Sequence, residues 1–523
     1  MDEMDEVVMI VDFYTSWERS GNQQFIAKFR SELLSNASYD AVSSNLTASY
    51  QNSLLLRKWL RDCDENHNYC HRRLGKENFW PKRVIYVGDP NKLTLVEEQP
   101  QREEYLVLSH CWGPLEDQDK KRFCTTSENY GSRKLGFGYD ELPKTFQDAV
   151  QVTRALQKQY LWIDALCIIQ EGPDCDWDTE AKTMADIFAC AYCTIAASSA
   201  RGWGDGFLEP QSDPPDIGAQ GTPTTPTCIC DFDKDVDEGN LMKRAWVLQE
   251  RVLSRRTIHF SAAHIYCECG DGVLCEQLTK LKPPPGKQYF ILDPHFPDRL
   301  TNCGYTRAID FVQFLFKKYS TSGLSFETDR DIAVYSLIAR MGEVLSTRVR
   351  YGIFRCFLGS LLLWRRIYGK KSPPISYKDR TVPSWSWMAY SGGIDFISDA
   401  KKDLMVPLLI DLDFANDEQA LNVKVRKFGG NYRMEQKGEE HAIVDGTKEV
   451  GSLWFDVADQ IYLKDCNCVV VSMVRDLSVE DSRKTYHVLI IRGKAGGGGY
   501  ERVGVGKVEA PYVSIDGVAG TLL

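Results

Sequence analysis

The sequence predicts an α/β fold whose centre is a parallel β-sheet. Three short apolar runs, near 105–109, 160–165 and 193–198, have the length and residue content of buried strands. Helical patterns over 143–158 and 177–191 lie between them, and this alternation predicts parallel strands joined by right-handed crossovers. We expect the functional centre in the same stretch, from about Tyr105 to Glu276.

Local signals set the bounds of these elements. An earlier strand-like run begins at Arg83 and stops before Gly88-Asp-Pro. Pro143 suits the start of a helix, and Phe146, Val150, Thr153 and Gln157 follow it with a helical period. Asp176 has the residue type of an N-cap for the second helix.

The length of the chain, 523 residues, predicts several packed regions, because single cores stop growing near about 250–300 residues. We expect a flank of helix and strand (1–100), an α/β unit (101–280), a helical region (281–390) and a β-rich region (391–523). Within them the patterns predict helices near 305–320, 329–346 and 352–368, and long loops at 204–240 and 283–299.

Composition excludes several classes of partner. The net charge of −10 argues against broad binding to nucleic acids or anionic membranes, which needs a dense positive surface. No apolar run approaches the roughly 20 residues of a membrane span. The acidic start, MDEMDEVVMIVDF, does not resemble a secretory signal, so we expect a cytoplasmic protein whose 17 cysteines are thiols.

Polar residues gather where two of the predicted strands end. Ligands of open parallel sheets bind outside the carboxyl ends of the strands, so these residues are candidates for a site. Asp164 is a candidate catalytic residue, and a structural cap or ion pair is the alternative. The candidate substrate-binding residues at these two ends are Ser109, His110, Cys111, Trp112, Gly113, Cys167 and Gln170.

Glu180 is the second candidate catalytic residue. On a helix it shares one face with Met184, Ile187, Phe188 and Ala191, and this otherwise apolar face must turn toward the sheet. The helix N-terminus favours the charged carboxylate, whereas burial opposes it. The alternative is a glutamate that caps backbone amides.

Two other chemistries find weaker support. A cysteine nucleophile at Cys111 would need a base. Neighbouring residues on a strand point to opposite faces, so His110 could be that base only if the chain turns after the strand. Otherwise His259 or His264 would have to act as the base. A zinc site is conceivable from Cys63, His67, Cys70 and His71, completed by Cys267, Cys269 or Cys275. Neither spacing is that of a standard zinc motif, so the sequence favours packing, with no metal and no bound cofactor.

Five segments, taken in order and spacing, resemble the HET (heterokaryon incompatibility) domain of filamentous fungi. The segments are Tyr105–Gly113, Leu142–Ala149, Tyr160–Gln170, Asp176–Met184 and Arg244–Leu253. Flanking motifs also look like those of such proteins: Trp59-Leu-Arg-Asp-Cys-x3-His67-x2-Cys70, Val382-Pro-Ser-Trp-Ser-Trp387 and Tyr500-Glu-Arg-Val-Gly504.

The resemblance implies a role in non-self recognition and programmed cell death. HET domains look distantly related to TIR domains, which are flavodoxin-like parallel sheets, many of which cleave NAD. The catalytic glutamate of TIR domains lies on a helix in a Trp-Cys-x-x-Glu-like setting, and Trp177-x-x-Glu180 sits at the matching place. The resemblance also adds Trp177, Gln249 and Glu250 to the candidate substrate-binding residues.

The leading hypothesis is a fungal HET-domain effector of cell death that cleaves NAD, with NAD as substrate. Glu180 would stabilise the ribosyl cation, Asp164 would orient water, and Trp112 or Trp177 would stack on a ring. One alternative is a non-catalytic recognition module that binds a protein partner or itself. Another is an enzyme of fungal secondary metabolism that uses the same pocket on a different small molecule.

Overall fold

The computed structural model describes most of the chain from Ala48 to Leu523. The described ranges are 48–67, 70, 79–97, 103–114, 116–209, 230–270, 272–276, 280–281, 299–302, 304–367, 373–377, 380–397, 405–407, 412–456, 461–475, 484–494 and 496–523. Most of the predicted N-terminal helical region, most of the loop at 204–240 and nearly all of the Pro-rich loop lie outside these ranges.

A nine-stranded mixed sheet forms the N-terminal half, with the order β11-β10-β9-β8-β7-β3-β5-β1-β2. Its strands are β1 (Arg83–Tyr86), β2 (Thr94–Glu97), β3 (Tyr105–Ser109), β5 (Tyr160–Trp162), β7 (Cys193–Ala196), β8 (Arg256–Phe260), β9 (Ile265–Cys269), β10 (Gly272–Cys275) and β11 (Lys280–Leu281). A separate short pair joins β4 (Thr125–Thr126) to β6 (Ile169–Glu171).

The four central strands are parallel, which confirms the predicted fold class. β3 pairs in parallel with β5 on one side and β7 on the other, and β7 pairs in parallel with β8. In chain order the four strands therefore run 2-1-3-4, the order that begins flavodoxin-like sheets. The outer strands pair antiparallel, so the sheet as a whole is mixed.

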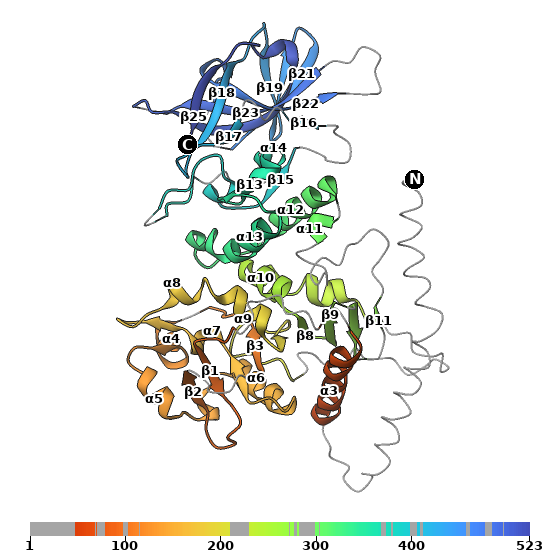
Figure 1. Ribbon diagram of the computed structural model, residues 1–523, viewed down its shortest axis with the longest axis vertical. Coiled ribbons are helices and arrows are strands. Elements are labelled where there is room, and N and C mark those ends of the chain that lie inside the picture. The colour runs from red at the N-terminus through yellow and green to blue at the C-terminus, as the bar shows by residue number, and fades with distance from the viewer. Residues whose placement is uncertain are drawn as a thin grey trace, which may run out of the picture.

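Helices fill the connections between the strands and lie before and after them (Figure 1). They are α3 (Ala48–Asn66), α4 (Asp117–Phe123), α5 (Tyr130–Leu135), α6 (Lys144–Ala155), α7 (Asp164–Cys167), α8 (Trp177–Glu180), α9 (Met184–Cys190) and α10 (Ala245–Leu253). The predicted helix 143–158 ends earlier, at Ala155, because Gln157 takes a left-handed φ of 59°.

The predicted helix 177–191 is two short helices, α8 and α9, separated by a turn at 181–183. Its predicted inward face is nevertheless buried along its whole length, from Glu180 to Ala191. Asp176 occupies the predicted N-cap position of α8, but its side chain makes no capping hydrogen bond. Its carboxylate instead accepts hydrogen bonds from Arg83 and from Lys82, the latter at 2.9 Å, because the buried Arg83 guanidinium needs a counter-charge.

A helical layer follows the sheet along the long axis of the molecule in Figure 1. It contains α11 (Arg299–Asn302), α12 (Tyr305–Ser320), α13 (Ile332–Val344) and α14 (Leu358–Leu362). The two long helices match the predicted ones near 305–320 and 329–346. The third prediction, helix over 352–368, is wrong for most of its length, where short strands β13 (Ile353–Phe354) and β14 (Trp364–Arg366) flank α14.

The C-terminal region is rich in β-strands, as predicted, and holds a ten-stranded sheet. Its strands are β16 (Met405–Pro407), β17 (Leu412–Phe414), β18 (Leu421–Lys427), β19 (Arg433–Lys437), β20 (Glu440–Asp445), β21 (Lys448–Phe455), β22 (Asn467–Arg475), β23 (Lys484–Gly493), β24 (Tyr500–Glu509) and β25 (Val518–Leu522). Short pairs β12 (Val349–Arg350) with β13, and β14 with β15 (Ile394–Phe396), precede it.

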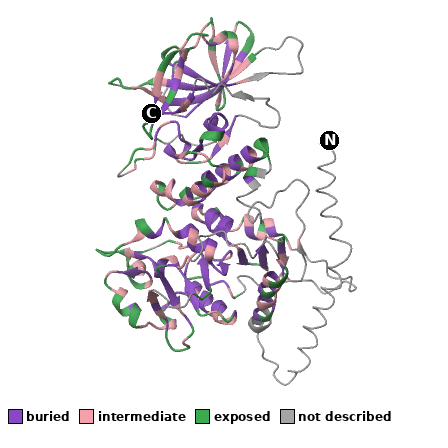
Figure 2. Ribbon diagram, viewed as in Figure 1, coloured by how far each residue is buried: buried purple, intermediate pink, exposed green. Residues whose placement is uncertain are grey.

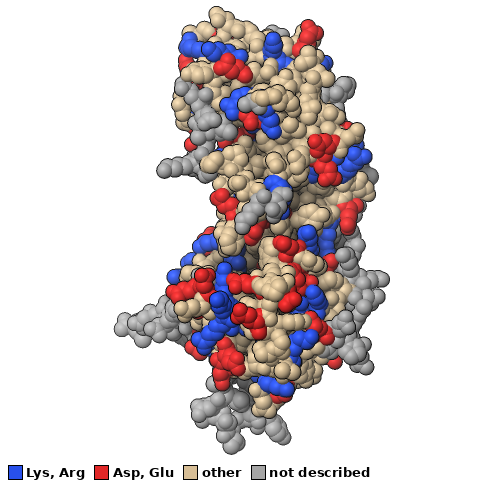
Figure 3. All heavy atoms as spheres, turned by 90° about the vertical axis from the view of Figure 1, so that its left-hand side faces the viewer, with Lys and Arg blue, Asp and Glu red and all other residues tan. Residues whose placement is uncertain are grey.

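Burial follows these layers (Figure 2). One core of buried side chains runs from α10 through α12 and α13 to β18 and β24, and a second fills the space around the central strands and α6. On the face shown in Figure 3, acidic and basic side chains are interspersed over the sheet half. Within the described ranges, no helix is both long and apolar enough to cross a bilayer.

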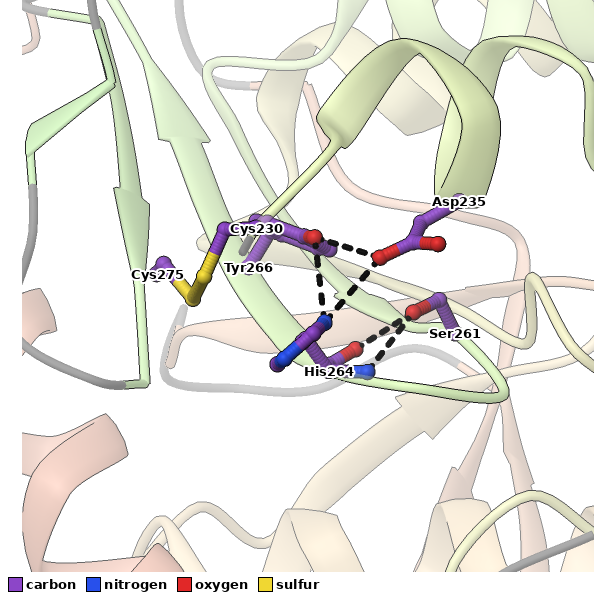
Figure 4. The surroundings of a disulfide bond; sticks show 6 residues. All are labelled: Cys230, Asp235, Ser261, His264, Tyr266 and Cys275. Carbon is purple, nitrogen blue, oxygen red and sulfur yellow. Dashed lines mark hydrogen bonds and ion pairs between the residues drawn. A yellow bond between two sulfur atoms is a disulfide. The ribbon is translucent and has the colours of Figure 1, made fainter. Parts of the chain in front are cut away.

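The prediction that every cysteine is a thiol is wrong at one place. Cys230 and Cys275 form a disulfide that joins the segment predicted as the 204–240 loop to β10 (Figure 4). Beside it, Asp235 accepts hydrogen bonds from the Tyr266 hydroxyl at 2.5 Å and the His264 imidazole at 3.1 Å. Spacing along the chain did not indicate this pair, because 45 residues separate the two cysteines. The other cysteines in the described ranges are not disulfide-bonded.

Candidate functional site

The candidate site lies at the carboxyl edge of the central parallel strands. Ser109 is the last residue of β3, and Asp164 follows β5 as the first residue of α7. Because β3 and β5 are parallel neighbours, both residues lie at the same edge of the sheet. The chain moves from β3 to β5 on one side and then to β7 on the other, which makes the end of β3 a switch point of the kind that binds ligands.

Residues 109–112 alternate between the two faces of the sheet. His110 meets the ring of Phe146 in α6 edge-on, with 5.0 Å between centroids. Cys111 packs in the core that contains Leu248 of α10. His110 and Cys111 therefore cannot form a catalytic dyad, as predicted, because the extended backbone points the two side chains to opposite faces.

On the α6 face, Asp164 organises three of the predicted residues. Its Oδ2 accepts a hydrogen bond of 2.7 Å from the indole N–H of Trp112, and its Oδ1 lies 3.8 Å from Nδ1 of His110. Gln170 donates to the main-chain oxygen of Asp164 at 3.1 Å. Asp164 also accepts a hydrogen bond from the amide of Ala165, at 2.7 Å, which satisfies one backbone donor in the first turn of α7.

His110 is neutral near pH 7 in this setting. Burial lowers the pKa of its imidazole to about 4, Asp164 opposes this shift, and Arg244 adds to it. Its Nε2 is buried and has no hydrogen-bond partner within the described part of the chain. A neutral ring with a spare nitrogen can donate to or accept from a bound molecule.

On the α10 face, Ser109 donates a hydrogen bond of 2.5 Å to Glu250. Ser109 also lines a small cavity between the sheet and α10, together with Thr194, Thr257 and His259. Glu180 and Asp164 do not line this cavity. Burial raises the pKa of Glu250 to about 7, and Ser109 and Arg244 oppose the shift.

The raised pKa of Glu250 predicts a specific pH dependence. A group whose folded-state pKa lies above its usual 4.5 favours folding below pH 4.5 and loses that contribution as pH rises through 7. Glu250→Gln keeps an oxygen acceptor for Ser109 and removes the charge. We expect the variant to be more stable than the wild type by up to about 3 kcal/mol at pH 8, with the difference vanishing at pH 4. Urea denaturation at both pH values measures this, and an equal difference at both would contradict it.

Gly113 closes the turn after β3. Its φ of +76° lies in the left-handed region, and a Cβ there would approach Cα of Gly202 to 2.9 Å. The two backbones thus touch, which holds the 201–205 turn, and with it the Trp203 ring that stacks on Trp112, against the candidate site.

We expect Gly113→Ala to destabilise the protein by about 1–3 kcal/mol, because a Cβ adds both strain and a backbone clash. Gly131→Ala is the matched control, since Gly131 lies inside α5 with open space around it and alanine there favours the helix by about 0.5–1 kcal/mol. Thermal melting of both variants separates the cases, and equal melting temperatures would refute the close approach.

Glu180 is buried, with 7% of its surface exposed. It does not complete a capping box, because the amide of Asp176 donates to the main-chain oxygen of Ile169. Burial raises the pKa of its carboxyl, while Arg83 and Lys82 lower it. Among the described residues, no hydrogen bond or ion pair joins Glu180 to Asp164. Both carboxylates, after burial, contribute to raising the pKa of the Cys167 thiol.

Of the remaining predicted site residues, some pack against neighbouring side chains and one has buried polar atoms without hydrogen-bond partners. The indole of Trp177 meets Trp246 edge-on at 6.1 Å. The amide of Gln249 is buried and neither of its polar atoms has a hydrogen-bond partner in the described ranges. Burial raises the pKa of Cys111, and that of Cys167 to about 12, so both remain thiols and the cysteine nucleophile loses its support.

Two arginines belong to this site that the sequence reasoning did not single out. Arg244 donates a hydrogen bond to the main-chain oxygen of His110. Arg83 donates to the oxygen of Cys167 at 2.6 Å and pairs with Asp176, beside Glu180. The sequence held a signal for each arginine. Arg244 is the first residue of the segment Arg244–Leu253, and Arg83 is a charged residue at the start of an apolar strand.

Comparison with protein families identifies this part of the chain. Residues 105–250 match the family model described as Heterokaryon incompatibility protein (HET). The matched segment begins with β3 and ends in α10, so it contains every predicted site residue. Neither the curated proteins nor the solved structures give a match. The chain therefore contains a HET domain at residues 105–250.

Proposed function

We propose that this chain is a fungal effector of non-self recognition and cell death whose HET domain, acting in a TIR-like manner, cleaves NAD. The observation that carries the proposal is Glu180. It is a buried carboxylate at the end of α8, which lies between β5 and β7 in chain order, and it binds no backbone amide in the described ranges and has Arg83 beside it. A residue that only capped α8 would not be placed in this way.

The proposed reaction breaks the bond between the nicotinamide nitrogen and the ribose. The electron pair of that bond leaves with nicotinamide, water adds to the ribosyl carbon, and one proton is released. An ionised Glu180 would stabilise the positive charge that develops on the ribose. Asp164 would orient the water, and the indoles of Trp112 or Trp177 would stack on a ring.

Two buried side chains among the candidate site residues have polar atoms without hydrogen-bond partners, which supports a bound ligand. Nε2 of His110 and both polar atoms of the Gln249 amide are buried without hydrogen-bond partners among the described residues. Such atoms are rare in folded proteins, and a ligand or water satisfies them. Arg244 and Arg83 would add positive charge for the phosphates of NAD.

The test is to incubate the purified full chain with NAD and to measure nicotinamide and ADP-ribose. We expect both products to appear in equal amounts, and cell death on expression in hyphae. Cell death without NAD loss would reject the catalytic part of the proposal and leave the recognition role.

A non-catalytic recognition module is the second candidate function. Asp164 and Glu250 are already satisfied by Trp112 and Ser109, as in a structural core. The helical layer also exposes aromatic side chains, with Phe326 63% and Tyr335 60% exposed, which suits contact with a protein partner or a second copy.

A further inference from the structure

Four side chains of the types that bind metals come from distant parts of the chain and meet beside the nine-stranded sheet. Cys63 lies on α3, His67 and Cys70 follow the end of that helix, and Cys269 ends β9. One sulfur or nitrogen atom from each residue can be chosen so that all four lie within 4.8 Å of one another. We propose that these residues bind one structural zinc ion.

The distances fit a tetrahedral zinc centre. Zinc bonds of about 2.3 Å to sulfur and about 2.0–2.1 Å to nitrogen place ligand atoms roughly 3.5–3.8 Å apart. Nδ1 of His67 lies 3.4 Å from Sγ of Cys269 and 4.0 Å from Sγ of Cys70. Three sulfurs and one imidazole nitrogen form one of the usual ligand sets of closed, four-coordinate structural zinc sites.

The cluster is buried and separate from the two large cores. The exposed fractions of Cys63, Cys70 and Cys269 are 1%, 2% and 6%, and these three residues form a small cluster of their own. None of the three is disulfide-bonded. Thiols are weak hydrogen-bond partners, so three sulfurs and a ring nitrogen this close together gain little from one another without a metal.

The surroundings hold the ligands in place. Oδ2 of Asp62 lies 3.8 Å from Nε2 of His67, the ring nitrogen that would not bind the metal, and a carboxylate in this position orients a metal-binding histidine. Arg255 donates to the main-chain oxygen of Cys70, and both Arg255 and Arg256 pair with Asp64, at 3.0 and 2.7 Å. These contacts fix the end of α3 against the start of β8.

The ion would fasten α3 to β9 of the nine-stranded sheet. Cys63, His67 and Cys70 lie before the matched family segment, and Cys269 lies after it. A zinc ion would therefore join the two flanks of the segment and hold α3 on β9. This role is independent of NAD cleavage, so either proposal can fail without the other.

Metal analysis of the full chain tests the site directly. We expect about one zinc ion per chain after expression with added zinc and removal of loosely bound metal. Replacement of the zinc by cobalt(II) should give the visible absorption of a tetrahedral thiolate site. Wild-type protein with neither bound zinc nor the cobalt spectrum would overturn the proposal, as would a disulfide between any two of the three cysteines.

Two variants on the same strand locate the fourth ligand. We expect Cys269→Ser to lose at least about nine-tenths of the zinc, because one of four ligands is gone. Cys267→Ser is the matched control, since Cys267 is similarly buried two residues earlier and lies in another cluster. It should keep its zinc. Loss of zinc from the control alone would show that the cluster is not the binding site.

Discussion

Replacing Glu180 by glutamine is expected to lower NAD hydrolysis by about 100- to 1000-fold, because a neutral amide cannot stabilise the ribosyl cation. The fold should persist. Since burial raises the pKa of Glu180, the folded state disfavours its charge, and a neutral residue of the same shape relieves this cost. Product release by the purified variant, together with its melting temperature, measures both effects. Hyphal cell death should fall with the activity.

Asp178→Asn provides the control for this experiment. Asp178 lies on the same helix, α8, but is exposed, so its loss removes an equal charge without touching the buried site. We expect wild-type hydrolysis from it. If both variants hydrolyse NAD at the wild-type rate, Glu180 is not the catalytic carboxylate. If Glu180→Gln unfolds, its role is structural and the recognition module becomes the better explanation.

The largest effect on stability is expected at Arg502, on β24. Its guanidinium is fully buried and donates to Asp456 at 2.8 Å and to the main-chain oxygen of Leu362 at 2.6 Å. It also lies over the ring of Trp364, 3.5 Å from the centroid. Arg502→Met would leave Asp456 buried without its counter-charge, which costs about 3–5 kcal/mol.

Arg492→Met is the matched control for Arg502. Arg492 pairs with Glu501 across the same hairpin, but the two side chains are 39% and 30% exposed. Exposed pairs contribute about 0–1 kcal/mol, so this variant should unfold at nearly the wild-type urea concentration. A double variant, Arg502→Met with Asp456→Leu, should recover part of the loss because it removes the stranded charge. Equal losses from the two single variants would contradict the argument.

Arg502 also explains two flanking motifs that the sequence could only compare with other proteins. Ser384, from the motif 382–387, accepts a hydrogen bond of 2.8 Å from the amide of Arg502, from the motif 500–504. The Trp364 indole donates to the main-chain oxygen of Trp385 at 2.9 Å. These motifs therefore meet in the interior between the helical layer and the C-terminal sheet, and their residues pack there.

The sequence alone predicted the elements whose signals are local. Strands β3, β5 and β7, helix α6 and the inward face from Glu180 to Ala191 follow from apolar spacing, which burial of the core enforces directly. Prediction from the sequence failed where contacts with distant parts of the chain overrode the local pattern. The helix expected over 177–191 breaks at 181–183, and the side chain of Asp176, at the N-cap of α8, pairs with Arg83 and does not cap the helix.

Contacts between distant residues were decided by the tertiary structure alone. Cys269 lies beside Cys63, His67 and Cys70, although 202 residues separate it from His67. In the same way Cys230 bonds to Cys275, and Ser109 donates a hydrogen bond to Glu250. Spacing along the chain cannot reveal such partners, because the sheet order brings them together. The sequence thus determined which polar residues follow the end of each strand, and the folding of the sheet decided which of them face one another.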